Sequence, residues 1–521
     1  MVQYYLCIVL IVFVFFLLIH EVARDLKTLG DSYKRISLCL ILVLLFKYNY
    51  GVHFYGLEYE DAFVFSFCAK QFSYNIFPSS FLIDGVSVGS LAGPLFTSTY
   101  GGHFIMYPTY LSLFTTVFGW SPTIISIANT IIAFLILLIL SLLPNNKFWF
   151  LPPVLYCCAP IINIFTTCFL SEIFSSFICL VFIYTYFRKR SIYNQVLCLT
   201  SFLVAIMCKR ENLVLLSIPV IELGHWMLNR IKCHEEVEIF RGIRYVPFLI
   251  LTCIYFLFIQ NVFSIEAIES NDIEDSTFSL RYTVILLPAF VKSLLNIETF
   301  SIVFAVSILW IICVMIRKYE IKFNLIFLFV LFMAYLILYS SHYRGYFFVK
   351  EKNVASFETY RYINNFFYLL PAMFVYLKCK CLKPIKILVC IALVFSLYNT
   401  YSLRHKLSEI EYQERFEEAQ KVSEYILTMS SSSVLVCENI LLYQNICGDD
   451  FNVCDIRLYE KLNVGNKVDC YLLLSDMDYL KERYSLNIDL NDFHPVMSLK
   501  GGKYLYKYGG IKTGQWKNPV P

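Results

Sequence analysis

The chain has 521 residues, of which 58% are hydrophobic, 18% aromatic and only 16% charged, and its mean hydropathy is +0.62. Soluble domains contain about 45–50% apolar and about 25% charged residues, so this composition excludes an ordinary soluble globular protein. The net charge is only +4, and basic residues form no stripe outside short loops, so nothing points to a nucleic-acid partner.

Long apolar runs recur from Tyr4 almost to Leu403. Many are long enough to cross a hydrocarbon core about 30 Å thick, and they predict an all-α polytopic membrane protein with about 11–13 transmembrane helices. A transmembrane barrel would instead show short alternating segments, and none occur. The first run lacks a basic region and a small-residue cleavage site, so we expect a retained helix rather than a signal peptide. The expected spans are 3–20, 36–50, 122–143, 148–165, 171–187, 192–208, 211–228, 245–262, 299–316, 323–340, 361–377 and 385–402.

Basic residues gather in short loops, which predicts the orientation of these spans. The loops are "RDLKTLGDSYKR", "RKR" at Arg188, "NRIKCHEEVEIFRGIR", "RKYEIK" and "KCKCLKPIK". By the positive-inside rule they face the cytoplasm. The number of crossings between the loop before Ile36 and "RKR" must then be even. The apolar segment 105–119, which contains Pro108, is therefore expected to be a short or re-entrant helix on the outer side.

The same count places three outer loops on one membrane face, at 51–104, 263–298 and 341–360, together with the turn that contains Lys209. The segment at 281–296 is apolar but ambiguous, and its crossing is left open. The chain lacks an N-x-[ST] sequon, which weakly favours a prokaryotic membrane. We therefore expect a multi-pass protein of a bacterial inner membrane whose outer loops face the periplasm or the exterior.

The composition changes after Leu403, so residues 1–403 form the transmembrane domain and residues 404–521 a small soluble domain. "RHKLSEIEYQERFEEAQKVSEYILTM" has the spacing of an amphipathic helix, and "SSVLVCE", "DCYLLLSD" and "HPVMSLKGGKYLYKY" resemble strands. "DYLKERYSL" resembles a further helix. By parity this α/β domain is extracytoplasmic. Disulfides are possible there, with three alternative pairings among four cysteines: Cys437, Cys447, Cys454 and Cys470.

Three acids stand close together in "GLEYEDAF" of the first outer loop: Glu58, Glu60 and Asp61. Acids favour helix N-termini, so one interpretation is a solvated cap for the helix "EDAFVFSFCAKQF", which would lie flat in the membrane interface. The other is a general base whose pKa the surrounding aromatics raise. Glu58 is interpreted as an ordinary loop acid.

The order of these features resembles the GT-C superfamily of polytopic glycosyltransferases, in particular the protein mannosyltransferases and lipid A aminoarabinose transferases. Members carry an acidic pair in the first outer loop, where this chain has Glu60 and Asp61. The resembling segments are "GLEYEDAF", "GGHFIMYPTYLSLFTTVFGWS", "FLSEIFSSFI", "CKRENLVLL" and "ETYRYINNFFYLLP", and together they cover roughly residues 36–400. This sequence has Glu-Asp where many members have Asp-Asp or Asp-Glu, so which carboxylate acts stays open.

The resemblance implies transfer of a sugar from a polyprenyl-phosphate donor to a glycan, lipid or protein acceptor, with inversion. The acceptor hydroxyl needs a base, for which we favour Asp61 with Glu60 as neighbour or second choice. The leaving phosphate needs positive charge more than a proton. The candidate phosphate ligands are Lys209, Arg210, Arg344 and Arg361, although Lys209 and Arg210 could equally reach a headgroup region. The candidate acceptor or sugar contacts are His103, Tyr107, Glu172 and Tyr362. For Glu172, a role as a helix cap is favoured over a place in the wall of the acceptor site.

Other chemistry has little support. His53 and His103 could join Glu60 and Asp61 around a divalent metal, but the spacing is not diagnostic. There is no Walker loop, nucleotide fingerprint or nucleophile elbow. Two further functions remain open: a lipid-sugar flippase or transporter, which would place charges within its spans, and an O-antigen-type polymerase or ligase, which would depend on a late arginine-rich loop.

Overall fold

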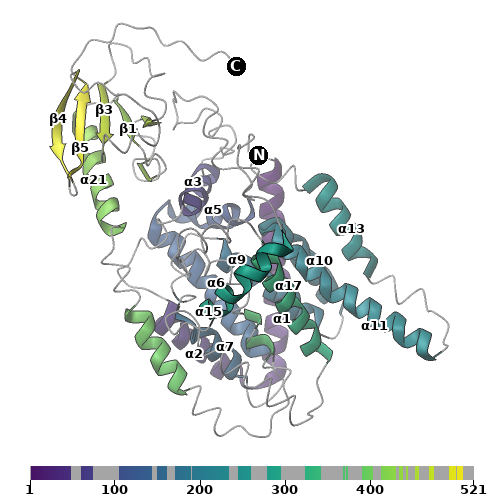
Figure 1. The fold of residues 1–521 in the computed structure, drawn as a ribbon. Helices are drawn as coiled ribbons and strands as arrows, with labels where there is room; N and C mark the ends of the chain where they lie inside the picture. The colour runs from purple at the N-terminus through teal and green to yellow at the C-terminus, as the bar shows by residue number, and fades with distance from the viewer. Residues whose placement is uncertain are drawn as a thin grey trace.

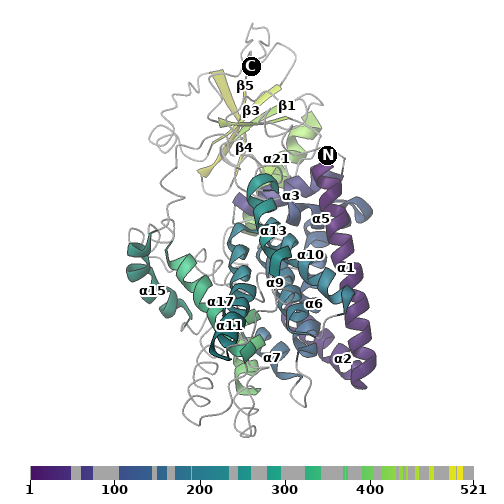
Figure 2. The ribbon, with the colours of Figure 1, turned by 90° about the vertical axis from the view of Figure 1, so that its right-hand side faces the viewer.

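The computed structural model of the chain is a long helical bundle with a small β-sheet at one end (Figures 1 and 2). The described residues are 2–47, 60–73, 105–143, 149–160, 163, 171–188, 191–233, 245–259, 279–294, 323–341, 368–369, 371–373, 390–402, 412–429, 433–437, 442–443, 452–456, 469–474, 492–499 and 502–508. The prediction of a mostly helical chain with a small sheet is confirmed.

The helical part contains α-helices, one 3-10 helix and two short π-helical turns. The α-helices are α1 (Val2–Leu29), α2 (Ser32–Leu42), α3 (Glu60–Ser73), α5 (Met106–Phe118), α6 (Pro122–Leu142), α7 (Leu151–Cys157), α9 (Glu172–Tyr186), α10 (Ile192–Cys208), α11 (Ser217–Cys233), α13 (Val246–Ile254), α15 (Leu280–Leu294), α17 (Phe323–Ser340) and α21 (Tyr412–Met429). The 3-10 helix η4 is Arg210–Leu216, and the π-turns are η1 (Val43–Lys47) and η6 (Tyr255–Ile259).

Within the described ranges, two helices are long and apolar enough to cross a membrane, Val2–Leu29 and Thr123–Leu142. Shorter apolar helices lie at Glu172–Tyr186, Ile192–Cys208, Val246–Leu257 and Leu325–Ser340. The predicted span 299–316 and most of 361–377 lie outside the described residues. The full number of crossings thus stays a prediction.

Three of the predicted spans differ in detail from the structure. α1 continues to Leu29 instead of ending at residue 20. The first residue that favours the end of a helix is Gly30, which has φ +69°. The expected span 148–165 is interrupted: α7 ends at Cys157, and Pro160 follows, a residue that cannot donate to a continuing helix. The expected span 211–228 begins with the 3-10 helix η4.

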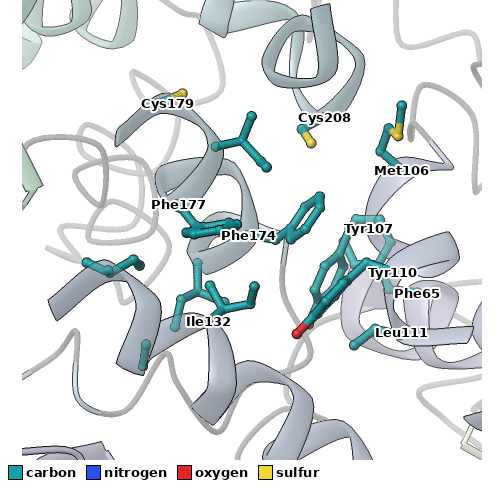
Figure 3. Packing of buried hydrophobic residues seen from close by; sticks show 14 of the residues in the cluster. Phe65, Met106, Tyr107, Tyr110, Leu111, Ile132, Phe174, Phe177, Cys179 and Cys208 are labelled. Carbon is teal, nitrogen blue, oxygen red and sulfur yellow. The ribbon is translucent and has the colours of Figure 1, made fainter. Parts of the chain in front are cut away.

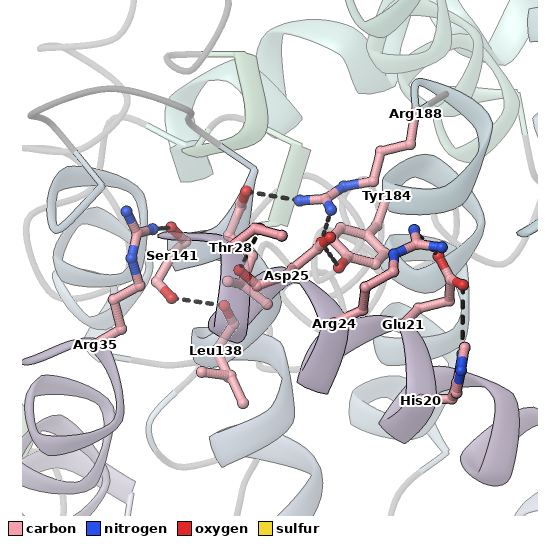
Figure 4. Close-up of polar contacts among 11 residues, drawn as sticks. His20, Glu21, Arg24, Asp25, Thr28, Arg35, Leu138, Ser141, Tyr184 and Arg188 are labelled. Carbon is pink, nitrogen blue, oxygen red and sulfur yellow. Dashed lines mark hydrogen bonds and ion pairs between the residues drawn. The ribbon is translucent and has the colours of Figure 1, made fainter. Parts of the chain in front are cut away.

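One end of the bundle holds a cluster of basic side chains (Figure 4). Arg188 pairs with Asp25 of α1 and donates to the carbonyl of Leu142 at 2.9 Å. Arg35 donates to Asp31 at 2.8 Å and to the carbonyl of Ser141. The two basic loops at 24–35 and 188–190 were predicted to share a membrane side, and their described residues do lie at the same end.

The opposite end is where α3 and α5 pack together near the start of α1. The Trp120 indole donates to Ser66 Oγ at 3.0 Å, and Tyr4 of α1 stacks on Phe72 with ring centroids 4.4 Å apart. Because α5 has only thirteen residues, it is too short to cross a bilayer, where about twenty are needed. This agrees with the expectation of a short helix at 105–119.

The core of the bundle is aromatic (Figure 3). The Tyr110 ring of α5 stacks on Phe174 of α9, with centroids 4.8 Å apart, and on Phe15 of α1, with centroids 6.0 Å apart. The Tyr110 hydroxyl donates to the carbonyl of Ala128 on α6 at 2.6 Å, so no polar atom of this ring is left without a partner. The rings join α1, α5 and α9, and the hydrogen bond of Tyr110 adds α6.

The C-terminal region forms a five-stranded sheet in the order β2-β1-β3-β5-β4. The strands are β1 (Ser433–Cys437), β2 (Asn452–Asp455), β3 (Asp469–Leu474), β4 (Phe493–Ser498) and β5 (Tyr504–Tyr508). β1 runs parallel to β2 and β3, whereas β5 runs antiparallel to β3 and β4. α21 buries Ala419, Val422 and Ile426 along one face, so the predicted amphipathic helix and α/β character are confirmed.

Two features of this region were not predicted. The run "HPVMSLKGGKYLYKY" is a hairpin rather than one strand, because Gly502 adopts φ +76° and turns the chain. β2 lies in "FNVCD", which is too short and polar to stand out. Cys437 and Cys470 are buried on the adjacent strands β1 and β3, Cys447 lies outside the described residues, and the disulfide pairing stays open.

The sheet carries a buried tyrosine that should make its stability depend on pH. Burial raises the pKa of Tyr471 above 10.0, and Lys507 lowers it only in part. Burial lowers the pKa of Lys507, but the Asp469 carboxylate, 3.1 Å away, and Tyr471 outweigh this and raise it above 10.5. Both raised values stabilise the sheet below about pH 10, and this stabilisation is lost as the pH rises further. We expect proteolysis of residues 412–508 to accelerate above about pH 10, and Tyr471→Phe to weaken this dependence.

Candidate functional site

The acidic pair begins a helix. α3 starts at Glu60, so Glu60 and Asp61 are the first two residues of a helix N-terminus, where the helix dipole favours negative charge. The prediction that a helix begins at these acids is confirmed. One turn after Asp61, Phe65 meets Tyr107 of α5 edge to face, with centroids 5.3 Å apart. The start of α3 is therefore held against α5.

Tyr107 connects three helices. Its side chain is only 1% exposed, and its hydroxyl donates to Asn129 Oδ1 on α6 at 3.1 Å. Its ring lies 6.2 Å from that of Phe174 on α9. This burial favours a role in fixing α3 and α5 over the sugar contact expected from sequence.

Glu172 and Lys209 form an ion pair across 37 residues of sequence. Lys209 Nζ donates to Glu172 Oε1 at 2.8 Å, and the two side chains are 16% and 2% exposed. Glu172 is the first residue of α9, as the expected cap position requires. The sequence interpretation assigned Glu172 to the acceptor and Lys209 to the donor phosphate, and the structure brings the two together.

Arg210 differs from its neighbour in exposure. Lys209 has an extended backbone, φ −152° and ψ 132°, and this single residue separates α10 from η4. Arg210 is exposed at the start of η4, and Tyr255, from the π-turn after α13, lies beside it. The sequence interpretation expected Glu211 to hold the Arg210 guanidinium. The carboxylate that pairs with a cation of this turn is instead Glu172 of α9, which accepts from Lys209 Nζ at 2.8 Å.

Asn212 is a residue that the sequence interpretation missed. Its Nδ2 donates to Ser175 Oγ on α9 and to the carbonyl of Ala205 on α10, both at 2.8 Å. Its Oδ1 accepts from the Tyr335 hydroxyl of α17 at 3.0 Å. An asparagine two residues after a basic pair, in an otherwise apolar run, is the only signal that the sequence gives.

Several candidates lie outside the described residues: His53, His103, Arg344, Arg361 and Tyr362. The side chains of Glu60 and Asp61 are also not described, although their helix is. Among the described residues, no group of three or more His, Cys, Asp or Glu side chains could hold a metal ion. The possible metal site of Glu60 and Asp61 with the two histidines therefore stays a prediction.

Comparison with known proteins gives a match at the level of fold. No family model matches the chain, and no curated protein sequence matches it. The crystal structure of ArnT from Cupriavidus metallidurans bound to undecaprenyl phosphate superposes with a TM-score of 0.53. The chain shares its fold with ArnT. The match covers 94% of this chain and 99% of that chain at 12% sequence identity. The apo form of ArnT gives a TM-score of 0.53 at 11% identity, covering 94% and 100% of the two chains.

Proposed function

We propose that this chain is a membrane glycosyltransferase of the GT-C type. It transfers a sugar from a polyprenyl-phosphate-linked donor to a glycan, lipid or protein acceptor. The observation that carries the proposal is the near full-length fold match to an ArnT structure that holds undecaprenyl phosphate. The acidic pair at the start of α3 and the basic turn after α10 add support, because both belong to the segments that resemble this superfamily.

The proposed site lies at the end of the bundle away from the basic cluster of Figure 4. We assign the basic end to the cytoplasm, and the end with α3, α5 and the sheet to the periplasmic or outer face of a bacterial inner membrane. The assignment includes about 11–13 crossing helices and an extracytoplasmic domain at 404–521. A lipid-linked donor would reach this end from the membrane, and the acceptor from the aqueous side.

The proposed chemistry needs one base and a cationic phosphate site. Asp61, with Glu60 as second choice, removes the proton of the acceptor hydroxyl as this oxygen attacks the anomeric carbon. The bond from that carbon to the phosphate oxygen breaks, and the anion leaves with inversion at carbon. Arg210 stabilises the leaving phosphate, together with Arg344 and Arg361. His103 and Tyr362 are proposed to contact sugar or acceptor. A divalent metal is not required by this scheme.

The first test is binding of undecaprenyl phosphate to the purified protein. Arg210→Gln keeps a polar side chain but removes the charge, so we expect Kd to rise about tenfold, the loss of one charge-assisted hydrogen bond. Lys34→Gln is the matched control, since Lys34 is an exposed cation at the opposite end. Equal affinities for the wild type and Arg210→Gln would remove Arg210 from the site.

The alternative functions give different results. A flippase or transporter would move lipid-linked sugar across proteoliposomes without forming a new glycosidic bond. A polymerase or ligase of the O-antigen type would be sensitive to substitution of basic residues in 341–361 and insensitive to substitution of acids in 58–61. The proposed transferase requires the acids.

A further inference from the structure

A buried polar cluster holds η4, the 3-10 helix that begins with the proposed phosphate ligand Arg210. It lies inside the bundle, and each member is at most 1% exposed. The members of this polar cluster are Ser175 and Cys179 of α9, Asn212 of η4, Tyr335 of α17, and Tyr368.

The contacts within the polar cluster centre on Asn212 and Tyr335. Asn212 bonds α9 and α10 through Nδ2, while Tyr335 donates to its Oδ1 at 3.0 Å. The Tyr335 hydroxyl is also 4.0 Å from Cys179 Sγ, and Tyr368 lies next to Tyr335 and Cys179. Both polar atoms of the Asn212 amide thus have partners, and every partner is on a different element from η4.

Through Asn212 the polar cluster ties η4, which carries Arg210, to three helices, α9, α10 and α17. Asn212 follows Arg210 by two residues. Tyr335 belongs to α17, which ends at Ser340. The end of α17 has a second attachment, because the carbonyl of Ser341 accepts from the amide of Ser279 at 2.8 Å.

We propose that Asn212 and Tyr335 are positioning residues that fix η4 against α9, α10 and α17, so that Arg210, two residues before Asn212, is held where it engages the phosphate of the lipid. This inference rests on the proposed function and adds to it the means by which the turn that carries Arg210 is held in place. A buried amide that loses a partner is costly, about 1–3 kcal/mol, so the cluster favours one arrangement of its members. Phosphate recognition needs the protein side chains to be held in place, because a binding side chain displaced by even about 1 Å makes a poor contact.

The test is Tyr335→Phe, which keeps the ring and its stacking on Tyr339 but removes the donor to Asn212. We expect Kd for undecaprenyl phosphate to rise roughly 3- to 10-fold, as for one buried hydrogen bond. We also expect faster hydrogen exchange of the amides in 209–216. Tyr110→Phe is the matched control: it deletes an equally buried tyrosine hydroxyl, bonded to Ala128 on α6, that is not part of the polar cluster. Its Kd should equal that of the wild type.

The outcomes separate this inference from the function on which it rests. Wild-type affinity in Tyr335→Phe, or an equal loss in Tyr110→Phe, overturns the positioning role while the transferase proposal stands. Failure of the wild type itself to bind undecaprenyl phosphate overturns both. In an Arg210→Gln background, Tyr335→Phe should weaken binding less than it does alone, and an undiminished effect would also count against the positioning role.

Discussion

Asp61→Asn should abolish sugar transfer while leaving a folded protein in the membrane. Asparagine has almost the same shape as aspartate but cannot accept the proton of the acceptor hydroxyl, and a general base contributes about 10²- to 10⁴-fold to a rate. Asp61 is the second residue of α3, where loss of its charge removes a helix-dipole interaction of about 0.3–1 kcal/mol. Turnover of a lipid-linked donor by purified protein measures the effect, and thermal unfolding in detergent checks the fold.

The neighbouring acids provide the controls. Glu60→Gln should lower turnover less than Asp61→Asn if Asp61 is the base and Glu60 only orients it. The reverse order would exchange the two roles. Glu58→Gln should have wild-type activity, since Glu58 is interpreted as an ordinary loop acid. If Asp61→Asn and Glu60→Gln both turn over donor normally, neither acid is the base.

Local pattern was sufficient to predict several elements of this fold. The acids of "EDAFVFSFCAKQF" mark the start of α3 at Glu60, and the helical spacing of apolar residues in α21 matches its buried face. β1 and β3 were visible as short apolar runs because their residues are buried on both faces. Each of these signals lies within fewer than twenty residues.

The candidate site depended on contacts that no local pattern contains. Lys209 and Glu172 are 37 residues apart, and Asn212 and Tyr335 are 123 apart. Tyr107 shows the reverse case: an aromatic residue in a family-like motif suggested sugar binding, and the structure adds that its ring is buried. The residue types are read directly from the sequence and their side of the membrane is a prediction from it, whereas the partners of Lys209 and Asn212 follow from how α9, η4 and α17 pack.

Substitution of the Glu172–Lys209 pair should have the largest effect on stability. Glu172→Leu removes the counter-charge of the Lys209 ammonium, which is only 16% exposed. Lys209→Met likewise removes the counter-charge of the buried Glu172 carboxylate. Removing one partner of a buried pair costs about 3–5 kcal/mol, and we expect about 3 kcal/mol for each variant because Lys209 retains some water contact. The double variant Glu172→Leu/Lys209→Met should recover most of this loss, since an apolar pair of similar volume is often as stable as a buried ion pair. Thermal unfolding midpoints of the four proteins measure the coupling.

The same double variant decides what Lys209 does. In the structure its ammonium is committed to Glu172 at 2.8 Å, and the exposed cation of this turn is Arg210. If Lys209 serves to anchor the turn, the double variant should bind undecaprenyl phosphate within about twofold of the wild type, because η4 and Arg210 keep their place through Asn212. If instead Lys209 leaves Glu172 to contact the phosphate, the double variant should be as stable as the wild type and yet bind about tenfold more weakly. Stability and affinity thus separate a structural lysine from a phosphate ligand, which a single substitution at Lys209 would confuse.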